Sequence, residues 1–396
     1  DRILIANEDT LFQKNYSSEK IMQTLKGRQG TPVNLTLYRR SEDRIIQVEM
    51  KRGVVPLPSV EAHYLVDQNT GYLKINRFSQ TTYQEFKAAM EKLLSDGTEQ
   101  LILDLRNNPG GYLFPAKKIS NAFLKKDQTI VITQSNVGEE EKSLAKGDGF
   151  FQEGKLVVLV NEQSASASEI VAGAMQDNDR GWIIGRRTFG TGLVQQQMPL
   201  GEGDAVRLTT SKYFTPTGRS IQKPYNGDRD AYFEDIGNRY HTGEMADANK
   251  IPVSDSLAFK TPEGRTVFGG GGITPDFYIT NTNTEAEEWK AFILNSNLMN
   301  NFIFKQLDKN RRAFNALKKE DLMADQYIEM LPWHKLFVSY CIEKEVEIEI
   351  SEAETLKSVK SYLGLQLFGE NVFNEIKNQG DVFVARAKKL LDSLNN

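Results

Sequence analysis

The strongest constraint on the fold is a short apolar run that ends in a serine-rich turn and a helix. Residues 156–160 read Leu-Val-Val-Leu-Val, which is typical of a buried strand. Residues 164–168 read Ser-Ala-Ser-Ala-Ser and lead into a helix predicted over residues 167–177. This order places Ser166 at a helix N-terminus, where free N–H groups and the helix dipole stabilise a negatively charged oxygen. The segment is therefore a candidate site for acyl transfer.

A purely structural interpretation of the same residues is available. Ser166 and Glu169 form a Ser-x-x-Glu capping box, which commonly begins a helix and has no catalytic role. Two further motifs shift the balance: residues 103–111 read Leu-Asp-Leu-Arg-Asn-Asn-Pro-Gly-Gly, and residues 189–195 read Phe-Gly-Thr-Gly-Leu-Val-Gln. Asn-Pro-Gly-Gly alone is an ordinary turn. Two glycines nevertheless also let backbone N–H groups approach a bound oxygen.

Together, these three motifs resemble the tail-specific, or C-terminal processing, serine protease family. The resemblance covers roughly residues 1–280. It implies that Ser166 is the nucleophile, that the Ala167 amide and a glycine pair bind the oxyanion, and that Gln195 orients the base. The glycine pair is Gly110 and Gly111, and the further positions that match supporting residues of the family are Glu169, Asp177 and Thr188.

The sequence departs from the family at Thr191. There, 25 residues after Ser166, the family has a lysine whose neutral amine accepts the serine proton. A threonine hydroxyl is no useful base near neutral pH, and losing a positioned base commonly costs about 10²–10⁴ in rate. Three explanations stay open: an engineered inactive variant, a natural pseudoprotease, or another group acting as the base. Arg186 and Arg187 are poor bases because a guanidinium stays protonated. The histidines lie outside every motif: His63, His241 and His334.

The chain as a whole predicts three parts. The pattern of residues 1–53 predicts strands and a short helix over residues 17–26. This part resembles a partial PDZ domain whose carboxylate-binding loop would precede Asp1. The alternative is a small β-rich domain without a ligand. Residues 54–280 alternate strands and helices, which indicates an α/β fold, and the resemblance implies a crotonase-like protease core. Residues 281–396 predict an all-α region.

Three local expectations follow from the same pattern. A strand is expected over residues 72–78, and a single last helix over residues 373–394. Residues 226–250 read as a flexible insertion. Residues 215–224 are expected to line the substrate cleft, since similar wording occurs near the active site in the family.

Composition excludes several classes of protein. The 396 residues are 39% hydrophobic, which suffices for two or three globular domains. A net charge of −4 gives no indication of nucleic-acid binding, and the apolar runs are too short to span a membrane. The single Cys341 allows no intrachain disulfide. No His, Cys and carboxylate cluster has ligand spacing, so no metal or organic cofactor is implied.

The resemblance also implies partners and a location. Polypeptide substrates bound through their C-termini, a homo-oligomer, and export to the periplasm or cell envelope are expected. Because the chain starts at Asp1 and not at Met, we expect any signal segment or lipid anchor to lie outside it. Two other functions stay open. One is a non-catalytic protein that captures peptide ends, for which Thr191 is the best argument; the other is a hydratase-like enzyme acting on thioesters, for which we find no nucleotide-binding surface.

Overall fold

The computed structural model describes residues 1–12, 14, 16–201, 204–225 and 227–394. The chain separates into two compact units. Unit 1 consists of Asp1–Leu57 and Trp289–Gly369, and unit 2 consists of Pro58–Glu288 and Glu370–Asn396. Among the described residues, no helix is both long enough and apolar enough to cross a lipid bilayer. The mixed α/β fold predicted from the sequence is confirmed.

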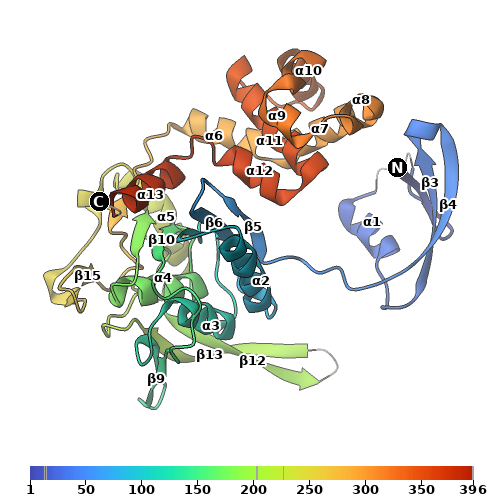
Figure 1. The fold of residues 1–396 in the computed structure, drawn as a ribbon. Helices are drawn as coiled ribbons and strands as arrows, with labels where there is room; N and C mark the ends of the chain where they lie inside the picture. Colours follow the sequence, from blue (N-terminus) through green and yellow to red (C-terminus); the bar gives the residue numbers. More distant parts are fainter. Residues whose placement is uncertain (13, 15, 202–203, 226, 395–396) are drawn as a thin grey trace. The chain divides into compact units, whose positions relative to one another are not determined.

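Unit 2 is built on a six-stranded sheet with the order β16-β11-β10-β7-β6-β5 (Figure 1). Strand β5 is antiparallel to its neighbour, and the other five strands are parallel. Strand β6 ends three residues before the expected position 78, because the Phe78 N–H instead donates to the Gly110 carbonyl at 2.8 Å. The strands are β5 (Val60–Leu65), β6 (Thr70–Ile75), β7 (Gln100–Asp104), β10 (Lys155–Val160), β11 (Trp182–Gly185) and β16 (Phe277–Tyr278).

Both faces of this sheet are covered by helices (Figure 1). In β7, Leu101 and Leu103 point to one face and pack in a core with side chains of three helices, whereas Ile102 points to the other face and packs with α13 (Val382–Ser393). The three helices of the first face are α2 (Thr82–Ser95), α3 (Leu113–Phe123) and α4 (Ala167–Asp177). Burial on both faces explains why the central strands are apolar runs and do not alternate with polar residues.

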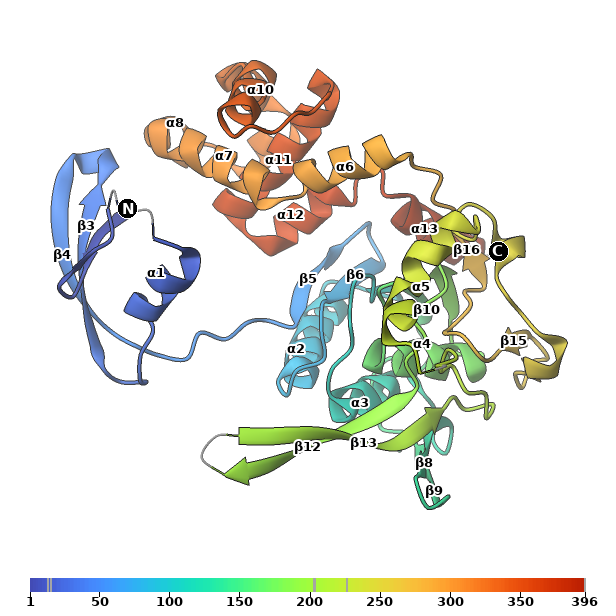
Figure 2. The ribbon, with the colours of Figure 1, turned by 180° about the vertical axis from the view of Figure 1, so that it is seen from behind.

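A second sheet in unit 2 is antiparallel and has the order β12-β13-β8-β9. Its edge strand β12 pairs with β13 in a long hairpin that extends away from the six-stranded sheet (Figure 2). The strands are β8 (Thr129–Ser135), β9 (Glu140–Leu144), β12 (Leu193–Gly201) and β13 (Asp204–Phe214). Smaller elements of this unit are β14 (Ala258–Lys260), β15 (Thr266–Phe268), η2 (Ala248–Lys250) and η3 (Asp255–Leu257).

The expectation of a flexible insertion over residues 226–250 was wrong for residues 227–250; residue 226 lies outside the described residues. The segment forms helix α5 (Arg229–His241). Its N-terminus is capped by the Asp228 side chain, and the buried Arg239 guanidinium donates to the carbonyls of residues 187–189. A polar composition suggested a loop, but these polar groups are used to cap and anchor a helix.

Unit 1 contains an antiparallel sheet with the order β2-β1-β3-β4 and a helical part. The short helix expected over residues 17–26 is confirmed, and the Ser17 hydroxyl caps it by accepting the Lys20 N–H at 3.2 Å. The first part comprises β1 (Arg2–Ala6), β2 (Asp9–Thr10), α1 (Ser18–Leu25), β3 (Pro32–Arg39), η1 (Arg40–Glu42) and β4 (Arg44–Lys51). The helical part comprises α7 (Asn297–Lys309), α8 (Arg311–Asn315), α9 (Lys319–Met323), η4 (Gln326–Met330), α10 (Trp333–Glu343) and α11 (Glu352–Phe368). Helix α6 (Glu285–Leu294) spans the boundary of the units.

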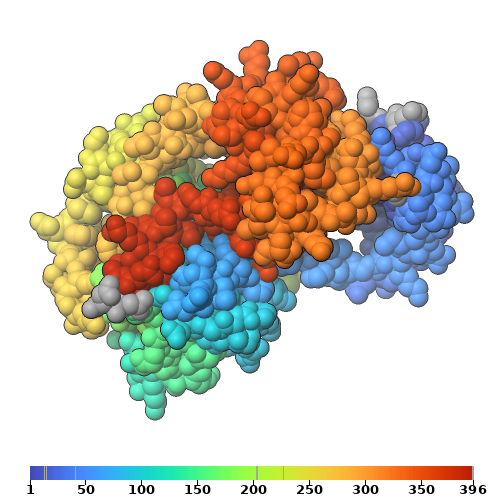
Figure 3. Space-filling model, turned by 45° about the horizontal axis from the view of Figure 1, so that its top comes forward, coloured from blue at the N-terminus to red at the C-terminus, as the bar shows by residue number. Residues whose placement is uncertain are grey.

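The helical region expected over residues 281–396 is divided between the two units, because its last two helices pack on the core of unit 2. These are α12 (Glu370–Lys377) and α13. The single helix expected over residues 373–394 is broken at Gly380, where φ is 81°, and Asp381 caps α13 by accepting the Phe383 N–H at 2.8 Å. Figure 3 shows the red C-terminal surface directly beside the blue surface of β5.

Substitutions in α13 test whether this helix belongs to the core. Phe383 is 8% exposed and Val382 is 61% exposed. We expect Phe383→Ala to lower the free energy of unfolding by about 3–5 kcal/mol, because it leaves a cavity under the sheet. Val382→Ala should change it by less than about 0.5 kcal/mol. Urea denaturation followed by circular dichroism measures both, and equally small losses would contradict the assignment.

Candidate active site

Ser166 lies at a sharp bend between β10 and α4. Its backbone angles are φ 53° and ψ −113°, a conformation that residues with a Cβ rarely adopt. The serines that cap α1, α7 and α11 have the extended backbone usual for a cap; they are Ser17, Ser296 and Ser351. Capping alone therefore does not require this bend. Backbone strain of this kind is concentrated at functional sites.

The loop that carries Gly110 and Gly111 lies directly against this bend. A Cβ on Gly110 would lie 2.7 Å from the Ser166 Cβ and 2.6 Å from the Ala165 carbonyl oxygen, and φ of Gly110 is 91°. Only glycine permits this approach. The loop and the bend are also joined by hydrogen bonds, since the Asn108 carbonyl accepts the Ala165 N–H at 3.0 Å and the Ser168 hydroxyl at 2.9 Å.

Three backbone amides were expected to hold an oxyanion, and they differ in availability. The Gly110 N–H donates to the Asn108 Oδ1 at 2.9 Å, so it is already occupied. Within the described part of the chain, the N–H groups of Gly111 and Ala167 have no acceptor. Both residues line the cleft that contains Ser166. Two amides beside Ser166 are thus free of hydrogen bonds to any residue that the structure describes.

The Glu169 carboxylate connects the bend to the loop that contains Thr191. Its Oε2 accepts the N–H of Ser166 at 2.9 Å and the N–H of Thr191 at 2.8 Å. Its Oε1 accepts the Gly190 N–H at 2.8 Å and the Thr188 hydroxyl at 2.5 Å. Burial raises the pKa of Glu169 to about 7, although these four hydrogen bonds lower it. Two of the expected supporting residues, Glu169 and Thr188, are therefore brought together with Ser166.

Tyr213 belongs to the same arrangement and was missed by the sequence analysis. It lies on β13, is 1% exposed, and its hydroxyl is 3.0 Å from the Ser166 carbonyl oxygen and 2.5 Å from the Thr191 carbonyl oxygen. In the sequence it is one aromatic residue in an alternating strand. The pairing of β13 with β12 brings its hydroxyl to the loop of Thr191, and the alternating pattern of the strand alone does not show which side chain this pairing places there.

Five of the candidate residues line one cleft of unit 2, which has a volume of about 1520 Å³: Gly111, Ser166, Ala167, Thr191 and Gln195. Ser166 and Thr191 are half-buried in it. Gln195 also lines the cleft, but it is exposed on β12, and no hydrogen bond joins it to Ser166 or Thr191 in the described structure. The expectation that residues 215–224 line the cleft is confirmed for Ser220, Gln222, Lys223 and Pro224.

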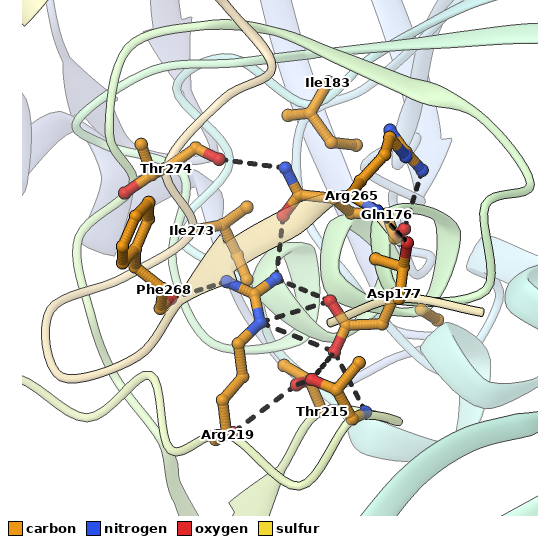
Figure 4. Close-up of polar contacts among 12 residues, drawn as sticks. Gln176, Asp177, Ile183, Thr215, Arg219, Arg265, Phe268, Ile273 and Thr274 are labelled. Carbon is orange, nitrogen blue, oxygen red and sulfur yellow. Dashed lines mark hydrogen bonds and ion pairs between the residues drawn. The ribbon is translucent and has the colours of Figure 1, made fainter. Parts of the chain in front are cut away.

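Asp177 does not reach this group. It ends α4, eleven residues after Ser166 in the chain, which corresponds to about 16 Å along a helix. Its carboxylate forms a fully buried ion pair with Arg219 at 2.7 Å and accepts the Thr217 hydroxyl at 2.6 Å. Arg219 also donates to the Gln176 Oε1 at 2.7 Å (Figure 4). Asp177 therefore fixes the far end of α4 and the segment that follows β13.

The pH dependence of stability tests the burial of Glu169. Its pKa is about 7 in the folded protein and near 4.3 in an unfolded chain, so between these values the folded state binds more protons and stability falls as pH rises. The loss should be about 2–3 kcal/mol from pH 5 to pH 8. We expect Glu169→Gln to have a lower free energy of unfolding than the unsubstituted chain. This free energy should also change less between pH 5 and pH 8, as measured by urea denaturation.

Glu85→Gln is the matched control for that experiment. The pKa of Glu85 is lowered by hydrogen bonds despite its partial burial, so it titrates at more acidic pH and should leave the slope between pH 5 and pH 8 unchanged. A Glu169→Gln variant with the slope of the unsubstituted chain would contradict the assignment.

Two glycine substitutions separate backbone strain from close approach. Gly110 and Gly138 have φ of 91° and 87°, but nothing lies within 4 Å of a Cβ on Gly138. Gly138→Ala should cost about 1–2 kcal/mol from its backbone conformation alone. Gly110→Ala should cost about 1–3 kcal/mol more, because its Cβ collides with the Ser166 bend. Equal losses in urea denaturation would mean that the two loops do not touch as described.

Part of the chain matches a known protein family. Residues 69–228 match peptidase family S41. A carboxy-terminal-processing protease of Bartonella bacilliformis is 39% identical over 202 residues, which are 50% of this chain and 46% of that protein. A probable CtpA-like serine protease of Staphylococcus haemolyticus is 38% identical over 206 residues, which are 51% of this chain and 40% of that protein. The matches thus span less than half of the length of these relatives.

Among solved structures, the photosystem II D1 C-terminal processing protease aligns with a TM-score of 0.40 and 24% identity, and the alignment covers 70% of this chain and 62% of that one. This likeness is too low to support a functional argument. The likeness of this chain to a known family therefore rests on the family match and on the two bacterial relatives. Residues 69–228 therefore match peptidase family S41, and the chain resembles the proteins named carboxy-terminal-processing protease and CtpA-like serine protease.

Proposed function

We propose that this chain has the scaffold of a serine endopeptidase of the C-terminal processing type, and that Thr191 impairs its hydrolytic activity. The observation that carries the proposal is the strained bend at Ser166, which lies in a large cleft beside two free backbone amides. Ser166 Oγ attacks a peptide carbonyl, and the N–H groups of Ala167 and Gly111 stabilise the oxyanion that forms. Gly110 supports the bend, and its N–H donates to the Asn108 Oδ1 and not to the oxyanion.

The missing component is a base. Thr191 stands at the position where the family has a lysine, and its hydroxyl does not deprotonate a serine near neutral pH. Glu169 holds the backbone N–H of Thr191 and not its side chain. The position of the loop is therefore independent of which side chain residue 191 carries. A lysine placed there would start from the same backbone position, with Gln195 on the neighbouring strand to orient it.

A non-catalytic peptide-binding protein is the second candidate, and Thr191 is the observation that favours it. The cleft and its edge strand β12 are retained when the base is absent. An extended peptide can pair with such an edge by adding a strand. Under this alternative the chain captures polypeptides and does not cut them.

Finer features of the proposal concern the other parts of the chain. Residues 1–53 are proposed to be a partial PDZ domain that binds substrate C-termini, supported by a four-stranded sheet with one helix. Residues 54–280 are proposed to have a crotonase-like protease core, and residues 281–396 to form the helical extension, with its last two helices on the core. Polypeptide substrates, export to the periplasm or cell envelope, and assembly into a homo-oligomer follow from the resemblance.

Restoring the lysine tests the proposal. Thr191→Lys should raise the cleavage rate of an unfolded protein by about 10²–10⁴ over the unsubstituted chain, because it supplies the base. Thr209→Lys is the matched control, since it adds the same charge at an exposed position of β13 opposite Gln195. Gel electrophoresis and mass spectrometry of the products measure cleavage.

The same assay distinguishes the candidates. Adding Ser166→Ala to Thr191→Lys should abolish the gain. Cleavage that survives Ser166→Ala would refute the role of Ser166. If Thr191→Lys binds peptides but does not cut them, the peptide-binding candidate is favoured.

A further inference from the structure

The charged side chains that line the cleft all have the same sign. They are Arg207, Lys212, Lys223 and Arg229, and no Asp or Glu lines the cleft in the part of unit 2 that the structure describes, residues 202–203 and 226 being outside it. The chain as a whole has 53 acidic and 49 basic residues and a net charge of −4. The cleft is thus a cationic region of an acidic protein.

Three of these cations are exposed, and they lie on two elements that line the cleft, β13 and α5. Arg207 and Lys212 lie on β13, where they pair in register with Gln197 and Leu193 of the edge strand. Arg229 is the first residue of α5. Its acidic neighbour Asp228 does not line the cleft, and its carboxylate accepts the N–H groups of Asp230 and Ala231 at the helix N-terminus.

The fourth cation is buried and incompletely neutralised. The Lys223 Nζ lies 3.8 Å from the Phe189 ring centroid and 4.2 Å from the Tyr232 ring centroid. Its nearest carboxylate, Asp235, is 3.5 Å away and is shared with Arg239 at 2.8 Å. Two cations thus share one carboxylate. Burial lowers the pKa of Lys223, Asp235 raises it, and Arg239 and Arg187 lower it further.

We infer that the cleft selects polypeptides that carry carboxylates near the bound segment, and this inference rests on the proposed function only in that a polypeptide enters the cleft. Positively charged side chains that line a cleft with a low dielectric constant concentrate the electrostatic field there. This field attracts anionic ligands. The unpaired edge of β12 offers backbone groups for an extended peptide, which favours a peptide over a nucleic acid. The carboxylates belong either to the chain end or to Asp and Glu side chains.

Four synthetic peptides distinguish these sources. They share one neutral sequence of about ten residues with an acetylated N-terminus, carry either two Asp or two Asn at the same interior positions, and end in a free carboxylate or an amide. Titration calorimetry with the Ser166→Ala variant measures binding without cleavage. We expect each carboxylate removed to weaken binding about two- to fivefold, and the differences to shrink in 0.5 M salt.

A charge-neutralised variant assigns the effect to the cleft. Arg207→Gln, Lys212→Gln and Arg229→Gln are combined in one variant, and Lys223 is left intact because it is packed between rings. The matched control combines Lys87→Gln, Lys92→Gln and Lys142→Gln, which remove the same charge from exposed positions outside the cleft lining. The cleft variant should lose the preference for acidic peptides, and the control should retain it.

The outcomes separate this inference from the proposed function. Tighter binding of the peptides with a free C-terminal carboxylate, or of the peptides with two Asp, supports the inference and shows which carboxylates the cleft binds. Equal binding of all four peptides, or an equal effect of the two triple variants, overturns it and leaves the proposed peptide cleft standing. If none of the peptides binds, the peptide cleft fails and the inference with it. A decathymidine oligonucleotide that binds as tightly as the most acidic peptide would show a general anion site and would also overturn it.

Discussion

The buried Glu169 carboxylate is the interaction on which the candidate site depends. It accepts four hydrogen bonds from two segments that are separated in the sequence, and two of the donors are the N–H groups of Ser166 and Thr191. One side chain therefore sets the spacing between the strained bend and the neighbouring loop. Removing it would leave several buried donors without acceptors, each at a cost of about 1–3 kcal/mol. Because the contacts at Ser166 and Thr191 are to backbone, they constrain position and leave the chemistry of residue 191 free to vary.

Helix α4 transmits this constraint through the core. All its residues are buried, and it is held by a carboxylate at each end: Glu169 in its first turn and Asp177 in its last. Close packing in between requires small residues. A Cβ on Gly173 would lie 2.9 Å from the Thr215 side chain. The helix that presents Ser166 therefore has little freedom to shift, which suits a site that depends on fixed backbone donors.

Local pattern predicted the elements well, because buried parallel strands and amphipathic helices leave a clear apolar signal. The strand and helix around Ser166, and the short helix predicted over residues 17–26, are examples. Features that depend on distant pairing could not be predicted in this way. The position of Tyr213 also depends on the pairing of β13 with β8, where its partner Thr133 lies 80 residues earlier in the chain.

The sequence analysis also misjudged polar groups whose partners lie elsewhere. Arg239 stabilises a helix where composition suggested a loop, since it bonds to carbonyls about 50 residues away in the chain. The Gly110 amide is occupied by Asn108, two residues before it, a bond that depends on the bend in the loop. Residues 281–396 are divided between the two units because α13 packs on the second apolar face of the sheet. No local pattern in the sequence identifies the helix that covers this face.

The position of α13 has a consequence for the order in which the protein assembles. This helix completes the core of unit 2, yet Trp289–Gly369, which belong to unit 1, precede it in the chain. During synthesis on the ribosome, the sheet that carries Ser166 emerges long before the helix that covers its second face. The core on that face contains residues as far apart in the chain as Ala62 and Leu391, and bringing such distant segments together slows folding. One apolar face of the sheet therefore remains open until residues 382–393 have been synthesised, which makes the nascent chain dependent on protection from aggregation during that interval.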